Sequence, residues 1–194
     1  MAILRVNRTL EPQGVHLERP TLSHQQQFLR AVRDSRALHR GWVSPPRDEE
    51  QFVLYVASLD ARNREGFFVR TGEGELAGVI NVSEIVRGAF QSAYLGYYAF
   101  VPFAGKGFMR QGLQLVIEYC FVTARLHRLE ANIQPDNARS IALVQSLGFA
   151  YEGFSPRYLK IEGRWRDHQR WALLVEDWKP QKSRKRRAPS TAAR

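Results

Sequence analysis

A glycine-containing loop between an apolar run and an amphipathic segment constrains the fold of this chain most. The apolar run that starts at Tyr94 ends at a short loop with Gly105 and Gly107. Past the loop, apolar residues recur at i, i+3, i+4, i+7, i+8 and i+11, at Leu113, Val116, Ile117, Cys120, Phe121 and Ala124. This spacing predicts a helix with one buried face that begins close to Gly107.

The start of such a helix attracts anions. Its first N–H groups have no partner within the helix, the dipole is positive there, and glycines let the backbone approach a phosphate without a Cβ atom. The loop is neither the six-residue dinucleotide fingerprint nor a Walker loop, because it has too few glycines and no Ser or Thr follows Lys106. A nucleotide-carrying cofactor is therefore the first hypothesis, against the alternative of a plain tight turn. Nucleotide hydrolysis is not expected.

The composition predicts one folded domain and a basic tail. A length of 194 residues, 44% of them apolar, suits a single domain with a substantial core. Of the formal net charge of +10, residues 179–194 carry +7 without any acidic residue, which leaves +3 for the rest. We expect residues 1–178 to fold and residues 179–194 to form a disordered tail. The tail either increases solubility or binds RNA electrostatically, with an affinity that falls with salt.

Membrane, disulfide and metal roles are not expected. The N-terminus has no apolar signal region and no apolar run reaches a membrane-spanning length, so a cytoplasmic location is predicted. Cys120 is the only cysteine and falls on the apolar helix face, as a buried structural thiol would. No histidine stands at ligand spacing from another histidine or from this cysteine, so no metal site is predicted.

Strand and helix patterns alternate along the rest of the chain. Helices are expected within residues 23–40, around residues 48–59, after Gly107 and before Gly148. Strands are expected at residues 15–22, from 67, at 76–86, 93–100 and 129–133, and in a hairpin of residues 150–161 and 165–175. The sum is an α+β fold, with a mixed, mostly antiparallel sheet of six or seven strands flanked by helices.

Four separated segments follow one another in an order that is typical of one protein family. They are the glycine loop, the strand that ends near Ile133, the segment Asn137–Ser140 and the segment Ser146–Phe149. This order resembles the GNAT superfamily of acetyl-coenzyme A dependent N-acyltransferases. Further segments are similar to its RimJ branch, the ribosomal-protein-alanine N-acetyltransferases, namely Val86–Gly88, Tyr94–Tyr97, His127–Arg128 and Gly163–His168. The resemblance covers roughly residues 15–178 and implies the GNAT fold with acetyl-CoA as cofactor.

The resemblance also implies how the cofactor is held. The family's phosphate loop falls on residues 104–109, where Ala104 and Met109 replace the preferred Gln or Arg and Gly or Ala. Backbone N–H groups do most of the binding in such a loop, so the cradle tolerates both changes. The pantetheine arm is expected along the strand end Tyr98–Val101, like an added strand. The implied cofactor-binding residues are Phe100, Val101, Gly105, Lys106, Gly107, Phe108, Met109, Asn137 and Ser140.

Ser140 is the implied proton donor to the leaving sulfur, although Asn137 and Ser140 also suit a helix N-cap and first turn. The family's carboxylate base falls on Asn132 and its tyrosine acid on Val144, so both usual groups are missing. A weak base suffices for an α-amine, whose pKa of about 7.7–8.0 lies well below the value of about 10.4 for lysine.

The proton acceptor is expected to be a water molecule held by Asn132, Glu130 or Glu84. Asn132 and Glu84 therefore join Ser140 as candidate catalytic residues. The oxyanion is expected to meet a backbone N–H near Phe100.

The predicted activity is acetyl transfer to the N-terminal α-amine of a protein, with the N-terminal alanine of a ribosomal protein as leading acceptor. The closing hairpin and the segment around Trp42 are expected to wall the acceptor groove, with peptide-reading candidates at Trp165, Arg166, Asp167 and His168. Two alternatives stay open. One is a small-molecule acceptor such as a polyamine, amino sugar or antibiotic, and the other is a noncatalytic RNA-associated module. Ribosome or RNA contact would come through the basic tail.

Overall fold

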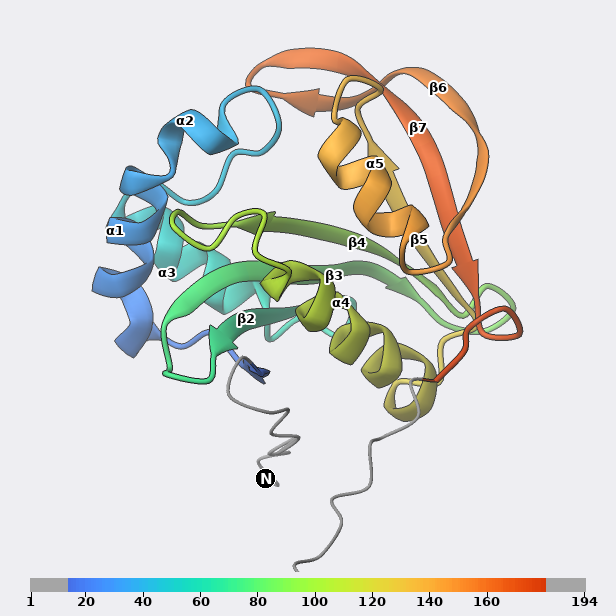
Figure 1. The fold of residues 1–194 in the computed structure, drawn as a ribbon, viewed down its shortest axis with the longest axis horizontal. Helices are drawn as coiled ribbons and strands as arrows, with labels where there is room; N and C mark the ends of the chain where they lie inside the picture. Colours follow the sequence, from blue (N-terminus) through green and yellow to red (C-terminus); the bar gives the residue numbers. More distant parts are fainter. Residues whose placement is uncertain (1–13, 181–194) are drawn as a thin grey trace, which may run out of the picture.

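The computed structural model describes residues 14–180, which form one seven-stranded sheet with helices on both faces (Figure 1). The predicted tail lies outside the described residues from position 181 on. The strands are β1 (Val15–Glu18), β2 (Glu65–Thr71), β3 (Leu76–Val86), β4 (Ser92–Ala99), β5 (Arg128–Ile133), β6 (Ala150–Ile161) and β7 (Arg164–Leu174). The helices are η1 (Leu22–His24), α1 (Gln25–Asp34), α2 (Arg36–His39), α3 (Glu49–Ser58), α4 (Phe108–Glu118), η2 (Tyr119–Thr123) and α5 (Ala138–Gln145).

The sheet opens in its middle. Its strand order is β1-β2-β3-β4-β5-β7-β6, and every neighbouring pair is antiparallel except β4 and β5. These two strands pair only through Ser92–Tyr94 and Arg128–Glu130. Beyond Tyr94, strand β4 therefore has an edge without a strand partner, although it lies in the centre of the sheet. The mixed, mostly antiparallel sheet of seven strands confirms the predicted fold class.

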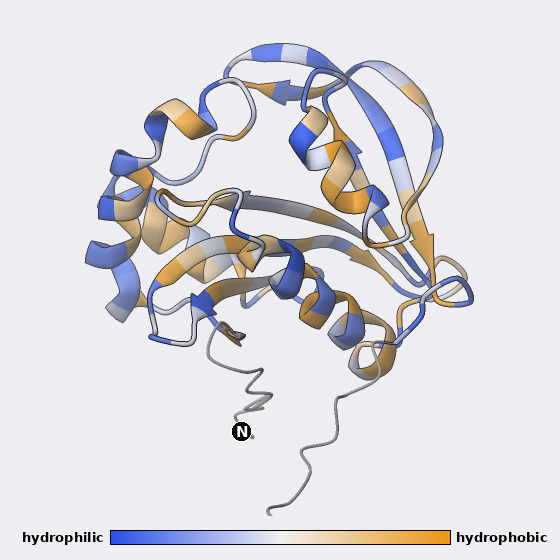
Figure 2. Cartoon of the chain, viewed as in Figure 1, coloured by the Kyte–Doolittle hydropathy of each residue, from blue (hydrophilic) through white to orange (hydrophobic). Residues whose placement is uncertain are grey.

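A hydrophobic core fills each face of the sheet. Helices α4 and α5 cover one face, where Leu113 and Ile117 of α4 pack against the sheet. Helices α1 and α3 cover the other face, where Phe28 of α1 and Phe52 of α3 meet Phe68 of β2. Figure 2 shows the hydrophilic outer side of α1 and the apolar residues of the middle strands. No helix within residues 14–180 combines the length and the apolarity that a membrane span requires.

Two predicted elements differ in extent. The strand expected over residues 15–22 ends at Glu18, because Pro20 has no N–H to continue a ladder. The long helix after Gly107 changes from α-helical to π-helical geometry at Tyr119, where the N–H of Ala124 bonds to the Tyr119 carbonyl at 2.9 Å. Both changes lie away from the opening between β4 and β5.

Candidate active site

A pocket of about 1160 Å³ lies at the opening between β4 and β5. It runs through the sheet, because α4 and α5 border it on one face and the α2–α3 loop and the β6–β7 hairpin on the other. Most predicted site residues line it, namely Glu84, Gly105, Gly107, Met109, Asn132, Asn137 and Ser140. Phe100, Val101, Lys106 and Phe108 are not among the lining residues.

The glycine loop enters α4 with a backbone that favours glycine. Gly105 has φ of +77° and Gly107, the N-cap of α4, has φ of +85°. A Cβ atom at either position would meet nothing within 4 Å, so backbone conformation rather than lack of space requires glycine there. The ring of Phe108 packs against Phe103, with centroids 5.7 Å apart, and thereby braces the loop. The first-turn N–H groups of α4 therefore start at the pocket, where the anion cradle is expected.

Replacing Gly107 with valine is expected to weaken coenzyme A binding at least about tenfold, because a side chain at positive φ costs about 1–2 kcal/mol or more and displaces the first helical turn. Titration calorimetry measures the effect. Gly74 is a matched control, since it has the same φ of +85° but lies in the β2–β3 turn outside the pocket. Gly74→Val should lower stability and leave the affinity unchanged; equal losses of affinity would argue against the cradle.

The open edge of β4 presents the backbone of Ala99 rather than that of Phe100. The N–H of Phe100 donates to the Ala77 carbonyl of β3 at 2.8 Å, and its ring is fully buried. The oxyanion donor expected near Phe100 is therefore not the Phe100 N–H itself. The backbone N–H and C=O groups of successive residues along a strand point to opposite neighbours. Because those of Phe100 face β3, those of Ala99 face the opening. The Ala99 N–H is the backbone donor that this edge offers beside Phe100.

Two side chains from the α1–α2 segment cap the end of this edge. The Ser35 hydroxyl accepts the N–H of Val101 at 3.0 Å, and His39 Nε2 donates to the Ala99 carbonyl at 2.8 Å. Sequence reasoning missed both residues. The available signal was spacing, because Ser35 and His39 continue the buried stripe that Phe28 and Val32 begin.

Buried His39 makes stability depend on pH. Burial lowers its pKa below the ordinary 6.5, although the bond to Ala99 acts in the opposite direction. Below pH 6.5 His39 becomes protonated in the unfolded chain but stays neutral in the folded chain. The free energy of unfolding should therefore fall as the pH drops from 6.5 toward the lowered pKa. Burial lowers the pKa of His168 too, so it adds a loss of the same sign. Urea unfolding at pH 7 and pH 5 should show a smaller loss for His39→Gln than for the wild type; an equal loss would contradict this assignment.

Ser140 is held by two side chains at the start of α5. Its N–H donates to Oδ1 of Asn137, the N-cap, at 3.2 Å, so Asn137 has the capping role weighed above. Its hydroxyl lies 2.7 Å from the Tyr97 hydroxyl of β4. Burial raises the pKa of Tyr97 to about 12, against the opposing effect of the Ser140 bond, so the phenol stays protonated. With Tyr97 donating, the Ser140 O–H is free to donate into the pocket.

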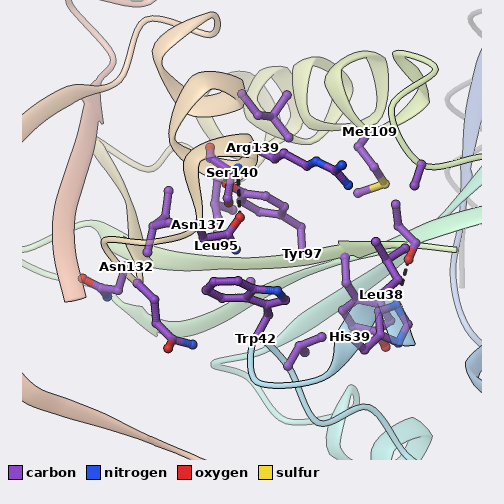
Figure 3. Close-up of a pocket in the computed structure, with 18 of the residues that line it drawn as sticks. Leu38, His39, Trp42, Leu95, Tyr97, Met109, Asn132, Asn137, Arg139 and Ser140 are labelled. Atoms are coloured by element: carbon purple, nitrogen blue, oxygen red, sulfur yellow. Dashed lines mark hydrogen bonds between the residues drawn. The ribbon is translucent and has the colours of Figure 1, made fainter. Parts of the chain in front are cut away.

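Tyr97 was not recognised as a site residue from the sequence, although it lies in the quoted segment Tyr94–Tyr97. Val144, where the family's tyrosine falls, is buried in the core at 1% exposure. The tyrosine that reaches the serine therefore comes from β4 instead of α5. Figure 3 shows Ser140, Asn137 and Arg139 on one side of the pocket, with Trp42 and His39 on the opposite side.

The other predicted catalytic residues, Asn132 and Glu84, line the same pocket. Asn132 lines the pocket, but its Oδ1 is enclosed without a hydrogen-bond partner. Glu84, at φ of +50°, has a side chain 59% exposed and lies 3.9 Å from Arg64. The hydroxyl of Tyr94 bonds to Tyr158, and this bond together with burial raises the pKa of Tyr94 to about 12. Neither Asn132 nor Glu84 therefore stands out as a base.

An irregularity in β6 brings its side chains to the pocket. The register with β7 shifts between Ser155 and Leu159, and Arg157 has φ of +47°. Its N–H donates to Oδ1 of Asp167 at 2.7 Å, so this carboxylate holds the backbone of the irregular segment. Among the four peptide-reading candidates, His168 alone lines the pocket. Trp165 is 61% exposed.

The α2–α3 loop borders the pocket, and two hydrogen bonds fix it at Gly41. The Gly41 N–H donates to the Glu162 carboxylate at 3.3 Å, and its carbonyl accepts from Gln134 at 2.7 Å. Arg47 joins Glu162 at 3.2 Å. The tip of the hairpin and the residue after β5 thus hold the segment of Trp42 at the pocket, so that the hairpin and this segment wall the pocket.

The residues fit an acylated nucleotide carrier. The glycine loop lies at the pocket with Arg110 and Arg139 nearby, the open β4 edge runs along it, and Ser140 lines it. Within residues 14–180, no three His, Cys, Asp or Glu side chains form a group that would hold a metal ion.

Comparisons with known proteins agree with this fit. The family model described as acetyltransferase (GNAT) domain matches residues 15–150. The [ribosomal protein uS5]-alanine N-acetyltransferase of Escherichia coli is 45% identical over 108 residues, 56% of each chain, so the match spans about half of that relative's length. A spermidine N(1)-acetyltransferase of Vibrio cholerae is 24% identical over 76% of this chain and 86% of its own.

Among solved structures, Mycobacterium smegmatis RimJ in complex with CoA-disulfide superposes with a TM-score of 0.78 at 26% identity, over 85% of this chain and 84% of that one. The RimJ-like relatives confirm the predicted resemblance at the level of family. The chain belongs to the GNAT acetyltransferase family, whose cofactor is acetyl-coenzyme A.

Proposed function

We propose that this protein acetylates the N-terminal α-amine of a protein, with the N-terminal alanine of a ribosomal protein as leading acceptor. The observation that carries the proposal is the passage of the pocket through the sheet. Ser140 with Tyr97 lies on one face, and an acceptor side of Trp42, Tyr158 and His168 lies on the other. An amine and a leaving sulfur therefore have separate places, as direct attack in a ternary complex requires.

Bound acetyl-coenzyme A supplies an activated acetyl thioester. Gly105, Gly107 and the first turn of α4 would hold its pyrophosphate, and the open edge at Ala99 would hold its arm. The Ser140 hydroxyl would donate a proton to the leaving sulfur. Asn132 and Glu84 would order water on the acceptor side.

The charge of the pocket favours a single amine over a polyamine. Glu84 is the only acidic residue among those that line the pocket in the described chain, and Arg110 and Arg139 line it as well. A polyamine carries several positive charges, which this lining would not neutralise. An α-amine suits it better, since roughly a tenth of such groups are already neutral at pH 7.

A small amine is the second candidate, because spermidine acetyltransferases align with most of this chain. Their identity of 24% is lower than the 45% of the ribosomal-protein relative. The uS5-alanine relative therefore gives the peptide acceptor more support.

The test is an acceptor panel with acetyl-coenzyme A. It contains a peptide with N-terminal alanine, the same peptide with a blocked N-terminus and an internal lysine, and spermidine. Thiol release gives the rate and mass spectrometry locates the acetyl group. Modification of the α-amine alone supports the proposal, and transfer to spermidine alone overturns it. Binding of acetyl-coenzyme A without transfer to any acceptor would indicate a noncatalytic module.

A further inference from the structure

The group that removes the proton from the amine is missing from the family positions of this chain. A base at neutral pH needs an unprotonated lone pair that faces the acceptor side. Asn132 carries an amide, which is not a base, and the Glu84 side chain is 59% exposed beside Arg64. The raised pKa of Tyr94 keeps its phenol protonated, and its hydroxyl is bonded to Tyr158. The pocket-lining histidines, His39 and His168, remain.

Hydrogen bonds distinguish the two histidines. His39 Nε2 donates to Ala99, and its Nδ1 is enclosed without a partner, so its lone pair does not reach the pocket. His168 Nδ1 lies 2.9 Å from the Arg166 carbonyl and must donate to it. This fixes the Nδ1–H tautomer and leaves the lone pair on Nε2, which has no hydrogen bond to any residue of the described chain.

His168 is also rigidly placed and uncharged. It is 3% exposed, and the Tyr158 ring meets its ring edge-on, with centroids 6.2 Å apart. The bond between Arg157 N–H and Asp167 fixes the irregular part of β6 that carries Tyr158. Burial lowers the pKa of His168 against the raising effects of the Arg166 carbonyl and Asp167, so the imidazole is neutral at pH 7.

We propose that His168 is the general base of the transfer, and that its Nε2 takes the proton of the attacking amine directly or through one water. The inference rests on the proposed transfer to an amine. The amine nitrogen forms the C–N bond and the C–S bond breaks. The sulfur takes the proton of the Ser140 hydroxyl and leaves as a thiol, and water then reprotonates Ser140. The His168 imidazolium releases the proton that it took from the amine to water. Base and acid thus stand on opposite faces of the sheet.

The test is His168→Gln, which keeps a donor for the Arg166 carbonyl. On whichever amine the wild type acetylates, kcat should fall about 100-fold or more. Coenzyme A affinity by calorimetry should change less than about threefold. Added imidazole should restore part of the rate, because it replaces a base and not a packing group. Should glutamine unfold the chain, His168→Asn takes its place.

His39→Gln is the matched control, since His39 also lines the pocket but its Nδ1 lone pair is enclosed. Any loss of rate in this variant should not respond to imidazole. A readout without turnover is the imidazole ¹⁵N spectrum of the free enzyme, where the signal lost in His168→Gln should be that of a neutral Nδ1–H ring. A kcat within about threefold of wild type, no rescue, or a charged ring at pH 7 would overturn the proposal. Since the comparison uses any acetylated amine, a wrong acceptor class does not affect it.

Discussion

Replacing Ser140 with alanine is expected to lower kcat for acetyl transfer about 100-fold, while the dissociation constant of coenzyme A changes less than about threefold. The reason is local. The Ser140 hydroxyl lies 2.7 Å from the Tyr97 hydroxyl, and with Tyr97 as the donor the Ser140 proton is free for the leaving sulfur. Alanine removes this donor and leaves the Asn137 cap intact, because the cap bonds to the backbone N–H. Steady-state kinetics and calorimetry measure the two quantities, and equal turnover in both proteins would reject the donor role.

The Tyr97 hydroxyl should matter only through Ser140. Tyr97→Phe is expected to lower kcat about tenfold in the wild type and hardly at all in Ser140→Ala, because coupled residues are not additive. Tyr119→Phe is the control, since the Tyr119 hydroxyl makes a bond of the same length, 2.7 Å, to Glu65 outside the pocket. Additive losses in the double variant would show that Tyr97 acts independently.

Replacing Phe28 with alanine is expected to lower the free energy of unfolding by roughly 3–5 kcal/mol. Phe28 is fully buried, and its ring centroid lies 4.8 Å from that of Phe52 and 5.7 Å from that of Phe68. Alanine would leave a cavity where α1 meets the sheet. For a chain of this size the melting temperature should fall by about 6 to 20 °C.

Urea unfolding measures the Phe28→Ala effect, and Leu22→Ala is the control. Leu22 is 56% exposed, so its truncation should cost less than about 0.5 kcal/mol. The loss at Phe28 should also lower activity at temperatures near the new midpoint, because α1 and α2 carry Ser35 and His39 to the edge of β4. A loss below about 1 kcal/mol would mean that the surrounding rings collapse into the space.

Local patterns determined the elements. Strand β3 has the bounds predicted from its apolar run, and α4 begins at Phe108, directly after the glycine that the helix start requires. The hairpin turns at Glu162 and Gly163, both at positive φ, as expected. These features depend on residues a few positions apart. Their stability comes from local backbone preferences and from the burial of one apolar side of each element.

The sequence by itself therefore determined the fold class and the positions of the glycine loop and of Ser140. The tertiary structure alone decided which groups surround them. Tyr97 meets a serine 43 positions away, Gly41 is held by Glu162 across 121 positions, and β4 offers the backbone of Ala99 instead of Phe100. Each of these contacts depends on strand register and on the separation of β4 from β5. A shift of the strand register by one residue would turn every side chain to the other face of the sheet. No local sequence pattern specifies this register across distant strands.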